Sequence, residues 1–530
     1  MTLCDFELRK ASTLNHQTNS TKNKTPLLCG IFLSKTFQRH IFNFQNGLSY
    51  DYWIDGDNAA KNGHVELLKY KPLSLSATGV QHSARFGKLH TLEWIHTNFD
   101  FEVGEYKELD AAVESGHMNI ISYILGKAKR KLSISRKSLN ICARNAHLKV
   151  LDWVYENRLE RCSSFGIDNC AENGSLEGLE WLHQNTNLKG STDAFDCAAR
   201  HGQYNVIKWL HQNRAEFPTT RAIDFAAMNG YLEVIEFLHY NRNEGCTPRA
   251  MNEAACSGRL DIVEWLHYHR NEGCTELAMD GSAGNGHIKI VEWLQQHRSE
   301  GATTLAMDRA AESGHLEIVE WLHRRRQEGC SPTAIDNAAR KGRLEVIEWL
   351  RANYPDVGCS SRAMDGAAGA GFFATLCWIH GNIPDATCTT RAMDQAAANN
   401  HLVVVEWLHA MREEGCTTQA LDSAAENGHI GMVEWLHRNR SEGCTFSAVD
   451  SAARNGHLSV VKFLLENRQE GCSVRAFDGA AYERHLLVLD YLNKQKANLG
   501  PQISSYNGSF SFQKKNFISR IQSGVSFQLL

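Results

Sequence analysis

Hydrophobic and polar positions repeat along most of this chain with a nearly fixed period. When the repeats are aligned on a recurring Gly-His step, the period from His147 to His485 is about 28 residues, with an occasional insertion of a single residue. The earlier steps, from His64 to Lys88, then to His117 and to His147, are less uniform in length. A period this regular predicts repeated supersecondary units stacked in a line.

Each repeat is predicted to hold two helices, as the unit at residues 306–333 illustrates (AMDRAAESGHLEIVEWLHRRRQEGCSPT). The first helix is predicted to begin after a hydroxyl N-cap such as Ser331 and to end at the glycine of the Gly-His step. The second has apolar residues at i, i+3 and i+4 spacing and is expected to run as far as Gly329. Antiparallel helices joined by short turns predict an all-α fold, an αα-solenoid of about 16 stacked helix-turn-helix repeats.

Three stretches, AAESGHLEIVEWL (310–322), AAENGHIGMVEWL (424–436) and AARNGHLSVVKFL (452–464), resemble the ankyrin repeat in their Ala-Ala, Gly-His and paired-valine positions. The resemblance covers roughly residues 55–492. The family's Thr-Pro-Leu-His opening is replaced by Ala-Met-Asp, and the unit is shorter than the usual ~33 residues. Since the second helix is expected to be about a turn longer than in the family, the β-hairpin finger is predicted to be shortened or absent. The resemblance implies partner binding, with the helix surface as the main candidate.

The repeat boundaries predict four segments. Residues 1–50 are expected to be irregular, with a partly helical cap, and residues 51–160 to hold divergent ankyrin-like repeats. Regular ankyrin-like repeats of nearly constant length are expected over 161–495, followed by an irregular C-terminal tail at 496–530.

Charge is unevenly distributed along the chain. The net charge is −4, but residues 1–40 contribute +4 and residues 494–530 contribute +5, which leaves −13 for the residues between them. An acidic body argues against nucleic acid as the partner. No apolar run reaches the ~18 residues that a membrane helix needs, and the polar N-terminal residues lack a secretory leader. We therefore expect an intracellular, cytoplasmic, monomeric protein whose partner is a protein of unknown identity, and neither nucleic acid nor a membrane.

Several residue types recur once per repeat. Eleven of the twelve tryptophans share one second-helix position, where we expect core packing between repeats rather than a stripe for ligand stacking. The recurring cysteines are expected to be small buried thiols, because successive repeats lie too far apart for disulfides and no four ligands converge on a zinc ion. The recurring aspartate of the first helix suits the helix dipole or a bond to a neighbouring repeat. No nucleophile or carboxylate pair departs from the pattern to work with the recurring histidines, so we expect no catalytic, cofactor-binding or metal-binding residue, no cofactor and no enzymatic activity.

Binding specificity is expected where the repeats differ from one another. First-helix positions just after the aspartate and just before the Gly-His step vary most, and stacked along one face they predict a mixed-charge surface suited to a protein partner. The alternative is neutral variation of a solvated face. The candidate partner-binding residues are Arg309, Glu312, Asn337, Arg340, Gln395, Glu426 and Arg454. The predicted function is an intracellular scaffold for protein–protein interaction, the alternative being an adaptor or effector-type substrate receptor that recruits other machinery through a terminal segment.

Overall fold

A computed structural model describes residues 55–70, 73–99, 101–104, 107–128, 132–157 and 159–496. These residues form 32 helices and no strand. The chain divides into two compact units at the boundary between Thr219 and Thr220. The expected irregular N-terminal segment, residues 1–50, lies outside the described residues, and so does the expected tail at 496–530 apart from Lys496.

In unit 1 the helices alternate between a first and a second helix of each repeat. The first helices are α4 (Gly56–Asn62), α6 (Ala77–Arg85), α8 (Glu108–Glu114), α10 (Arg136–Arg144), α12 (Phe165–Asn173) and α14 (Asp193–Arg200). The second helices are α5 (Val65–Tyr70), α7 (Leu89–Asn98), α9 (Met118–Lys127), α11 (Leu148–Glu156), α13 (Leu176–Asn185) and α15 (Tyr204–Asn213).

Unit 2 continues the same alternation. Its first helices are α16 (Thr220–Asn229), α18 (Pro248–Cys256), α20 (Leu277–Gly284), α22 (Thr304–Ser313), α24 (Pro332–Arg340), α26 (Ser361–Ala370), α28 (Thr390–Ala398), α30 (Thr418–Glu426), α32 (Phe446–Arg454) and α34 (Val474–Tyr482). Its second helices are α17 (Leu232–Asn241), α19 (Leu260–His269), α21 (Ile288–His297), α23 (Leu316–Arg325), α25 (Leu344–Asn353), α27 (Phe373–Asn382), α29 (Leu402–Met411), α31 (Ile430–Asn439), α33 (Leu458–Asn467) and α35 (Leu486–Gln495).

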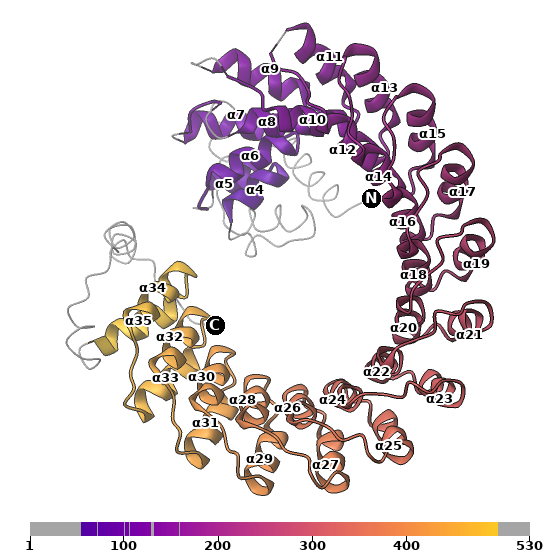
Figure 1. Cartoon of the computed structure of the whole chain (residues 1–530). Coiled ribbons are helices and arrows are strands. Elements are labelled where there is room, and N and C mark those ends of the chain that lie inside the picture. Colours follow the sequence, from indigo (N-terminus) through magenta and orange to yellow (C-terminus); the bar gives the residue numbers. More distant parts are fainter. Residues whose placement is uncertain are drawn as a thin grey trace, which may run out of the picture. The chain divides into compact units, whose positions relative to one another are not determined.

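Within each unit the first helices stack on one another and the second helices form a layer beside them (Figure 1). The repeated Ala-Ala pair makes this stacking close, since Ala338 and Ala339 of α24 are fully buried. Val346, Ile347 and Leu350 of α25 fill the space between the two layers. The expected αα-solenoid is confirmed, with 16 helix pairs among the described residues.

Most first helices of unit 2 begin and end where the residue types predict, although α20 has Glu276 as its N-cap with no side-chain bond. Ser331 caps α24 by accepting a hydrogen bond from the Thr333 amide, and Pro332 occupies the first helical position. The preceding first helix, α22, ends at Gly314 with φ of 88°, a left-handed conformation that a side chain disfavours. The hydroxyl N-cap and the C-terminal glycine therefore set these boundaries.

The second helix is shorter than predicted, and the expectation of an extra turn reaching Gly329 was wrong. Helix α23 ends at Arg325, and Arg326 is already extended with φ of −127° and ψ of 160°. The residues Arg326–Gly329 form the connection instead, because the Arg326 guanidinium binds the Glu328 carboxylate two residues later. The polar residues that follow the second helix thus form a turn rather than a further turn of helix.

The tryptophan row is less buried than a core position would be. Trp181 and Trp293 are buried, whereas the other members of the row are half-buried. Their rings do lie between repeats: the centroids of the His267 and Trp293 rings are 5.1 Å apart, edge to face. The ring position lies beside the buried valine and leucine positions of the second helix, next to a polar histidine, and this leaves part of each ring in contact with solvent.

Candidate partner-binding surface

The recurring aspartate of the first helix joins each repeat to the next. Asp308 Oδ1 accepts a hydrogen bond from the Ser331 amide at 2.8 Å, and its Oδ2 accepts from the Ser331 hydroxyl at 2.5 Å. Ser331 is itself the N-cap of the following first helix. The same bonds recur with threonine, as between Asp394 and Thr417 at 2.8 and 2.9 Å. One buried carboxylate thus positions the start of the next repeat, as one of the two interpretations of this aspartate predicted.

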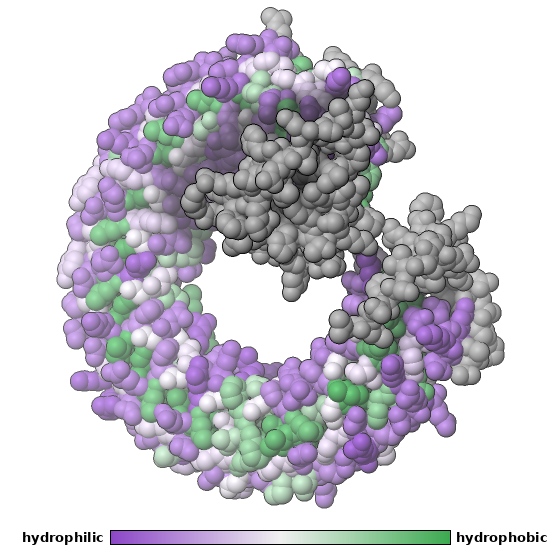
Figure 2. Space-filling model, turned by 180° about the vertical axis from the view of Figure 1, so that it is seen from behind, coloured by the Kyte–Doolittle hydropathy of each residue, from purple (hydrophilic) through white to green (hydrophobic). Residues whose placement is uncertain are grey.

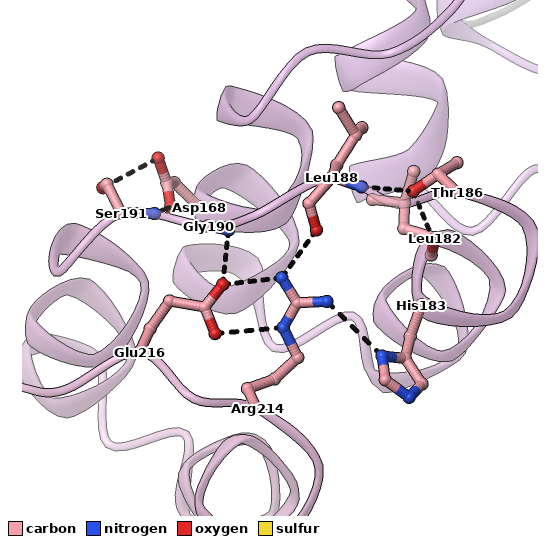
Figure 3. A network of polar contacts seen from close by, with 9 residues as sticks. All are labelled: Asp168, Leu182, His183, Thr186, Leu188, Gly190, Ser191, Arg214 and Glu216. Atoms are coloured by element: carbon pink, nitrogen blue, oxygen red, sulfur yellow. Dashed lines mark hydrogen bonds and ion pairs between the residues drawn. The ribbon is translucent and has the colours of Figure 1, made fainter.

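The Arg-x-Glu sequence after the second helix forms a second link, shown in Figure 3. Arg214 Nη2 donates to Glu216 Oε1 at 2.7 Å and to the Leu188 carbonyl of the preceding connection at 2.8 Å. Glu216 also accepts from the Gly190 amide at 2.7 Å. Arg214 Nη1 lies 3.4 Å from His183 Nδ1, and because arginine only donates, that nitrogen must be the acceptor. We call this group the arginine clasp.

The arginine clasp recurs through unit 2 and perturbs its own carboxylates. The hydrogen bond from Arg412, opposed by burial, lowers the pKa of Glu414 to about 2. The Glu414 carboxylate is therefore fully ionised near neutral pH and holds Arg412 in place. The clasp pairs of unit 2 are Arg242–Glu244, Arg270–Glu272, Arg298–Glu300, Arg326–Glu328, Arg412–Glu414, Arg440–Glu442 and Arg468–Glu470.

The recurring cysteines lie beside these clasps as unpaired thiols. All 14 cysteines of the described residues are free. Burial raises the pKa of Cys246 to about 12 and that of Cys274 to about 11, so both are protonated and weakly nucleophilic. This environment agrees with the prediction of small packed thiols.

The seven predicted site residues all lie on first helices of unit 2 and are at least partly exposed. Arg309, Arg340, Glu426 and Arg454 are exposed, while Glu312, Asn337 and Gln395 are half-buried. We use the term first-helix surface for the positions just after the aspartate and the positions just before the Gly-His step. Two members pack over glycines of a neighbouring helix: a Cβ atom added at Gly284 would lie 2.8 Å from Arg309, and one at Gly369 would lie 2.7 Å from Gln395.

Three of the predicted residues bind one another. Arg340 Nη2 donates to Glu312 Oε1 at 2.8 Å, and Asn337 Nδ2 donates to Glu312 Oε2 at 3.1 Å. These bonds cross from α24 to α22, so the charges of this pair are already neutralised within the chain. Among the described residues, no hydrogen bond or ion pair joins Arg309 or Gln395 to this group or to each other.

Two further predicted residues, Glu426 and Arg454, line an open hollow of about 760 Å³ at the ends of α30, α32 and α34. Its lining residues are Glu426, Asn427, Ser451, Arg454, Asn455, His457, Glu483 and His485. Sequence reasoning missed Glu483, although residues 482–485 (YERH) lack the glycine of the usual Gly-His step. That break in the repeat pattern is the signal that marks this position.

The described residues meet neither the requirements of a metal site nor those of a membrane-spanning helix. Within the part of the chain that the structure describes, no group of three or more His, Cys, Asp or Glu side chains could hold a metal ion. Among the same residues, no helix combines the length and apolar character needed to cross a bilayer. On the face shown in Figure 2, hydrophobic residues form separate patches among hydrophilic ones.

Comparisons with known proteins agree with the helical-repeat architecture. A family model described as ankyrin repeats in three copies matches residues 378–478, and one described as ankyrin repeats in many copies matches residues 167–211, 195–239 and 307–351. No curated protein sequence matches the chain.

Among solved structures, the chain is similar to the pentatricopeptide repeat protein PPR10 in complex with an 18-nt psaJ RNA element, at 11% identity and a TM-score of 0.33. That alignment covers 100% of this chain and 93% of the other. The structure of PPR10 from maize matches at 10% identity and a TM-score of 0.28, covering 85% of this chain and 79% of that one. Likeness this distant carries no information about ligands.

Proposed function

Because this chain is an ankyrin-repeat protein, we propose that it is an intracellular scaffold that binds a partner protein through its first-helix surface. The resemblance drawn from the Ala-Ala and Gly-His positions is confirmed by the family matches. Repeat proteins of this kind offer an extended surface whose composition changes from one repeat to the next.

The proposal rests on a difference between two sets of polar residues: those that recur in the repeats are bonded within the chain, and several of those that vary are exposed. The constant aspartates, clasp arginines and clasp glutamates bind within and between repeats, so they are occupied by the frame. The residues that vary, such as Arg309 and Arg454, are exposed instead. A surface of varied charges on a constant frame suits recognition of another protein.

Two features support an intracellular location. The described cysteines are all free, and several are held as protonated thiols by burial. Free thiols persist in reducing compartments. The acidic repeat region favours a protein partner over nucleic acid, since nucleic-acid binding depends on basic side chains.

The test reverses charge on the first-helix surface and asks whether the set of captured proteins changes. The variant carries R309E, R340E and R454E in the full chain, and its thermal melting is compared with that of the original chain. A matched control carries K289E, R325E and R438E, which change the same number of charges on exposed positions of second helices. Partners should be lost in the first variant and kept in the control. Unchanged partners in both would refute the proposed surface.

The adaptor alternative depends on terminal segments that lie outside the described residues. No contact of the described residues favours it over the scaffold.

A further inference from the structure

We propose that the hollow at the ends of α30, α32 and α34 binds an extended segment of a partner protein in which an acidic side chain lies between two basic ones. The inference rests on the proposed function and assigns the partner's chemistry at one place on the first-helix surface. The order of charges along the hollow supports it: Glu426 on α30, Arg454 on α32 and Glu483 after α34.

The three charges of the hollow are unpaired. Among the described residues, no ion pair or side-chain hydrogen bond involves the carboxylate of Glu426 or of Glu483, or the guanidinium of Arg454. All three lie at an open surface and border the same space. A charged partner can therefore bind these groups without breaking an ion pair within the chain, and this favours electrostatic recognition.

A second place on the same surface holds the same two residue types in contact. Glu312 and Arg340 occupy the same repeat positions as Glu426 and Arg454, nearer the N-terminal end of unit 2, and they are joined at 2.8 Å. There, Asn337 also donates to Glu312 and fixes its carboxylate. The equivalent residue in the hollow is Ser451, whose shorter side chain lines the space instead. The Glu426 carboxylate therefore lacks the amide donor that Glu312 has, and it borders the open space of the hollow.

The walls of the hollow are held by contacts between repeats. Asn455 Nδ2 donates to the Glu426 carbonyl at 2.9 Å. The His457 ring lies so close to Gly428 that an added Cβ atom there would be 2.5 Å from it, and the His485 ring lies nearly as close to Gly456, at 2.6 Å. These glycines also have positive φ. The rings and the amide are thus fixed before a partner arrives, which lowers the entropic cost of binding.

The spacing of the repeats selects an extended partner segment with a three-residue period. Neighbouring helices lie about 8–10 Å apart. A polyproline II segment has three residues per turn and rises ~3.1 Å per residue, so positions i, i+3 and i+6 share one face at ~9 Å intervals. A segment of the form Lys-x-x-Glu-x-x-Lys therefore places one complementary charge at each of three successive repeats, opposite Glu426, Arg454 and Glu483, the last of which stands one position later in its repeat than the other two. The volume of about 760 Å³ has room for such side chains.

The experiment uses eight synthetic, fluorescein-labelled peptides that carry Lys or Glu at i, i+3 and i+6 of a Pro/Ala-rich extended segment. Their binding to the purified full chain is ranked by fluorescence anisotropy at low salt. Lys-Glu-Lys should bind most tightly, ahead of Lys-Lys-Glu, which has the same total charge in a different order. Each mismatched pair should weaken binding up to about fivefold, the upper range for exposed ion pairs.

The decisive variant exchanges the charges of the hollow: E426K, R454E and E483K together. The ranking should reverse, so that Glu-Lys-Glu becomes the tightest peptide, a result that a variant with damaged folding cannot give. A ranking that follows only total charge, a ranking unchanged in the exchanged variant, or no binding by any peptide would each overturn the proposal.

Failure of the hollow is distinguishable from failure of the scaffold function. A variant with only R309E and R340E leaves the hollow intact. If it loses cellular partners while the exchanged variant keeps them, the scaffold function stands and the hollow is excluded as a site. If neither variant changes the captured proteins, the proposed function itself is refuted.

Discussion

Replacement of Asp308 by alanine isolates the bond that joins one repeat to the next. The side chain is 3% exposed and accepts hydrogen bonds from the Ser331 amide, the Ser331 hydroxyl and the Thr333 hydroxyl. The chain contains its own control for the charge: Asn252 occupies the same position in another repeat, where it accepts from the Thr275 amide at 2.9 Å and donates to the Thr275 hydroxyl at 2.8 Å. D308N should therefore keep the geometry that D308A removes.

The magnitude follows from the groups left without an acceptor. A hydrogen bond to a charged group contributes about 1.5–3 kcal/mol, and an unsatisfied buried donor costs a similar amount. The Thr333 hydroxyl is exposed and can bond to water, whereas the Ser331 amide loses its acceptor. We expect D308A to reduce the local free energy of unfolding by about 2–4 kcal/mol and D308N by less than about 1 kcal/mol.

Hydrogen exchange of the full chain, read by mass spectrometry, is the suitable assay, because neighbouring repeats can open without the whole array unfolding. Amides of α22 and α24 should exchange at least about 30-fold faster in D308A, which corresponds to about 2 kcal/mol. Peptides from distant repeats of the same variant serve as the internal control and should be unaffected. Equal protection of α24 in D308A and D308N would refute the reasoning, because it would mean that the carboxylate bonds contribute nothing to the link.

The stability of the array should also fall in mild acid, and its thiols should react in a defined order. Burial, with a nearby arginine, lowers the pKa of His239 and His267 below 6.5, so the unfolded chain takes up protons more readily and stability is lost as the pH falls below that value. Gln295 occupies the same repeat position and accepts from an arginine at 3.0 Å without titrating, so H239Q/H267Q should lose less stability between pH 7 and 5.5 in urea unfolding. In iodoacetamide mapping of the native chain at pH 8, the more exposed Cys377 should react before Cys246, whose pKa burial raises to about 12.

Each of these two predictions has a clear contrary result. If the double glutamine variant keeps the full acid dependence, histidine titration does not destabilise the fold. Equal alkylation of the two cysteines in the native chain, with the same rates in urea, would mean that burial does not protect the thiols.

The boundaries of the first helices could be predicted because they depend on local residue types, such as the Ser331 hydroxyl and the glycine of each Gly-His step. The end of the second helix could not. Arginine, glutamine and glutamate are good helix formers, so the residues after Arg325 favour a longer helix on propensity alone. Bonds from the arginine clasp to the preceding connection outweigh that preference, and these bonds cross about one repeat.

The position of the candidate surface could be predicted from the sequence, but which of its charged residues are paired with one another could not. Comparison of repeats identifies the variable positions, because constant residues belong to the frame. It does not reveal that Glu312 is paired with Arg340 while Glu426 and Arg454 are apart, since the residue types are the same in both places. The two places also differ at a third residue, Asn337 or Ser451, and whether the charges are in contact is visible only when side chains of adjacent helices are placed together.

The aspartate link also bears on how such a chain changes length over evolutionary time. Each carboxylate bonds 23 residues ahead, or 24 where the connection is one residue longer, as from Asp336 to Ser360. A duplicated or deleted unit of one full repeat therefore meets an equivalent acceptor and an equivalent donor, serine or threonine, at its new junction. Unequal recombination within the gene can add or remove whole repeats while the frame stays satisfied. Each such event moves the charges of the surface by one row, so that new recognition patterns arise by insertion of complete modules as well as by point mutation.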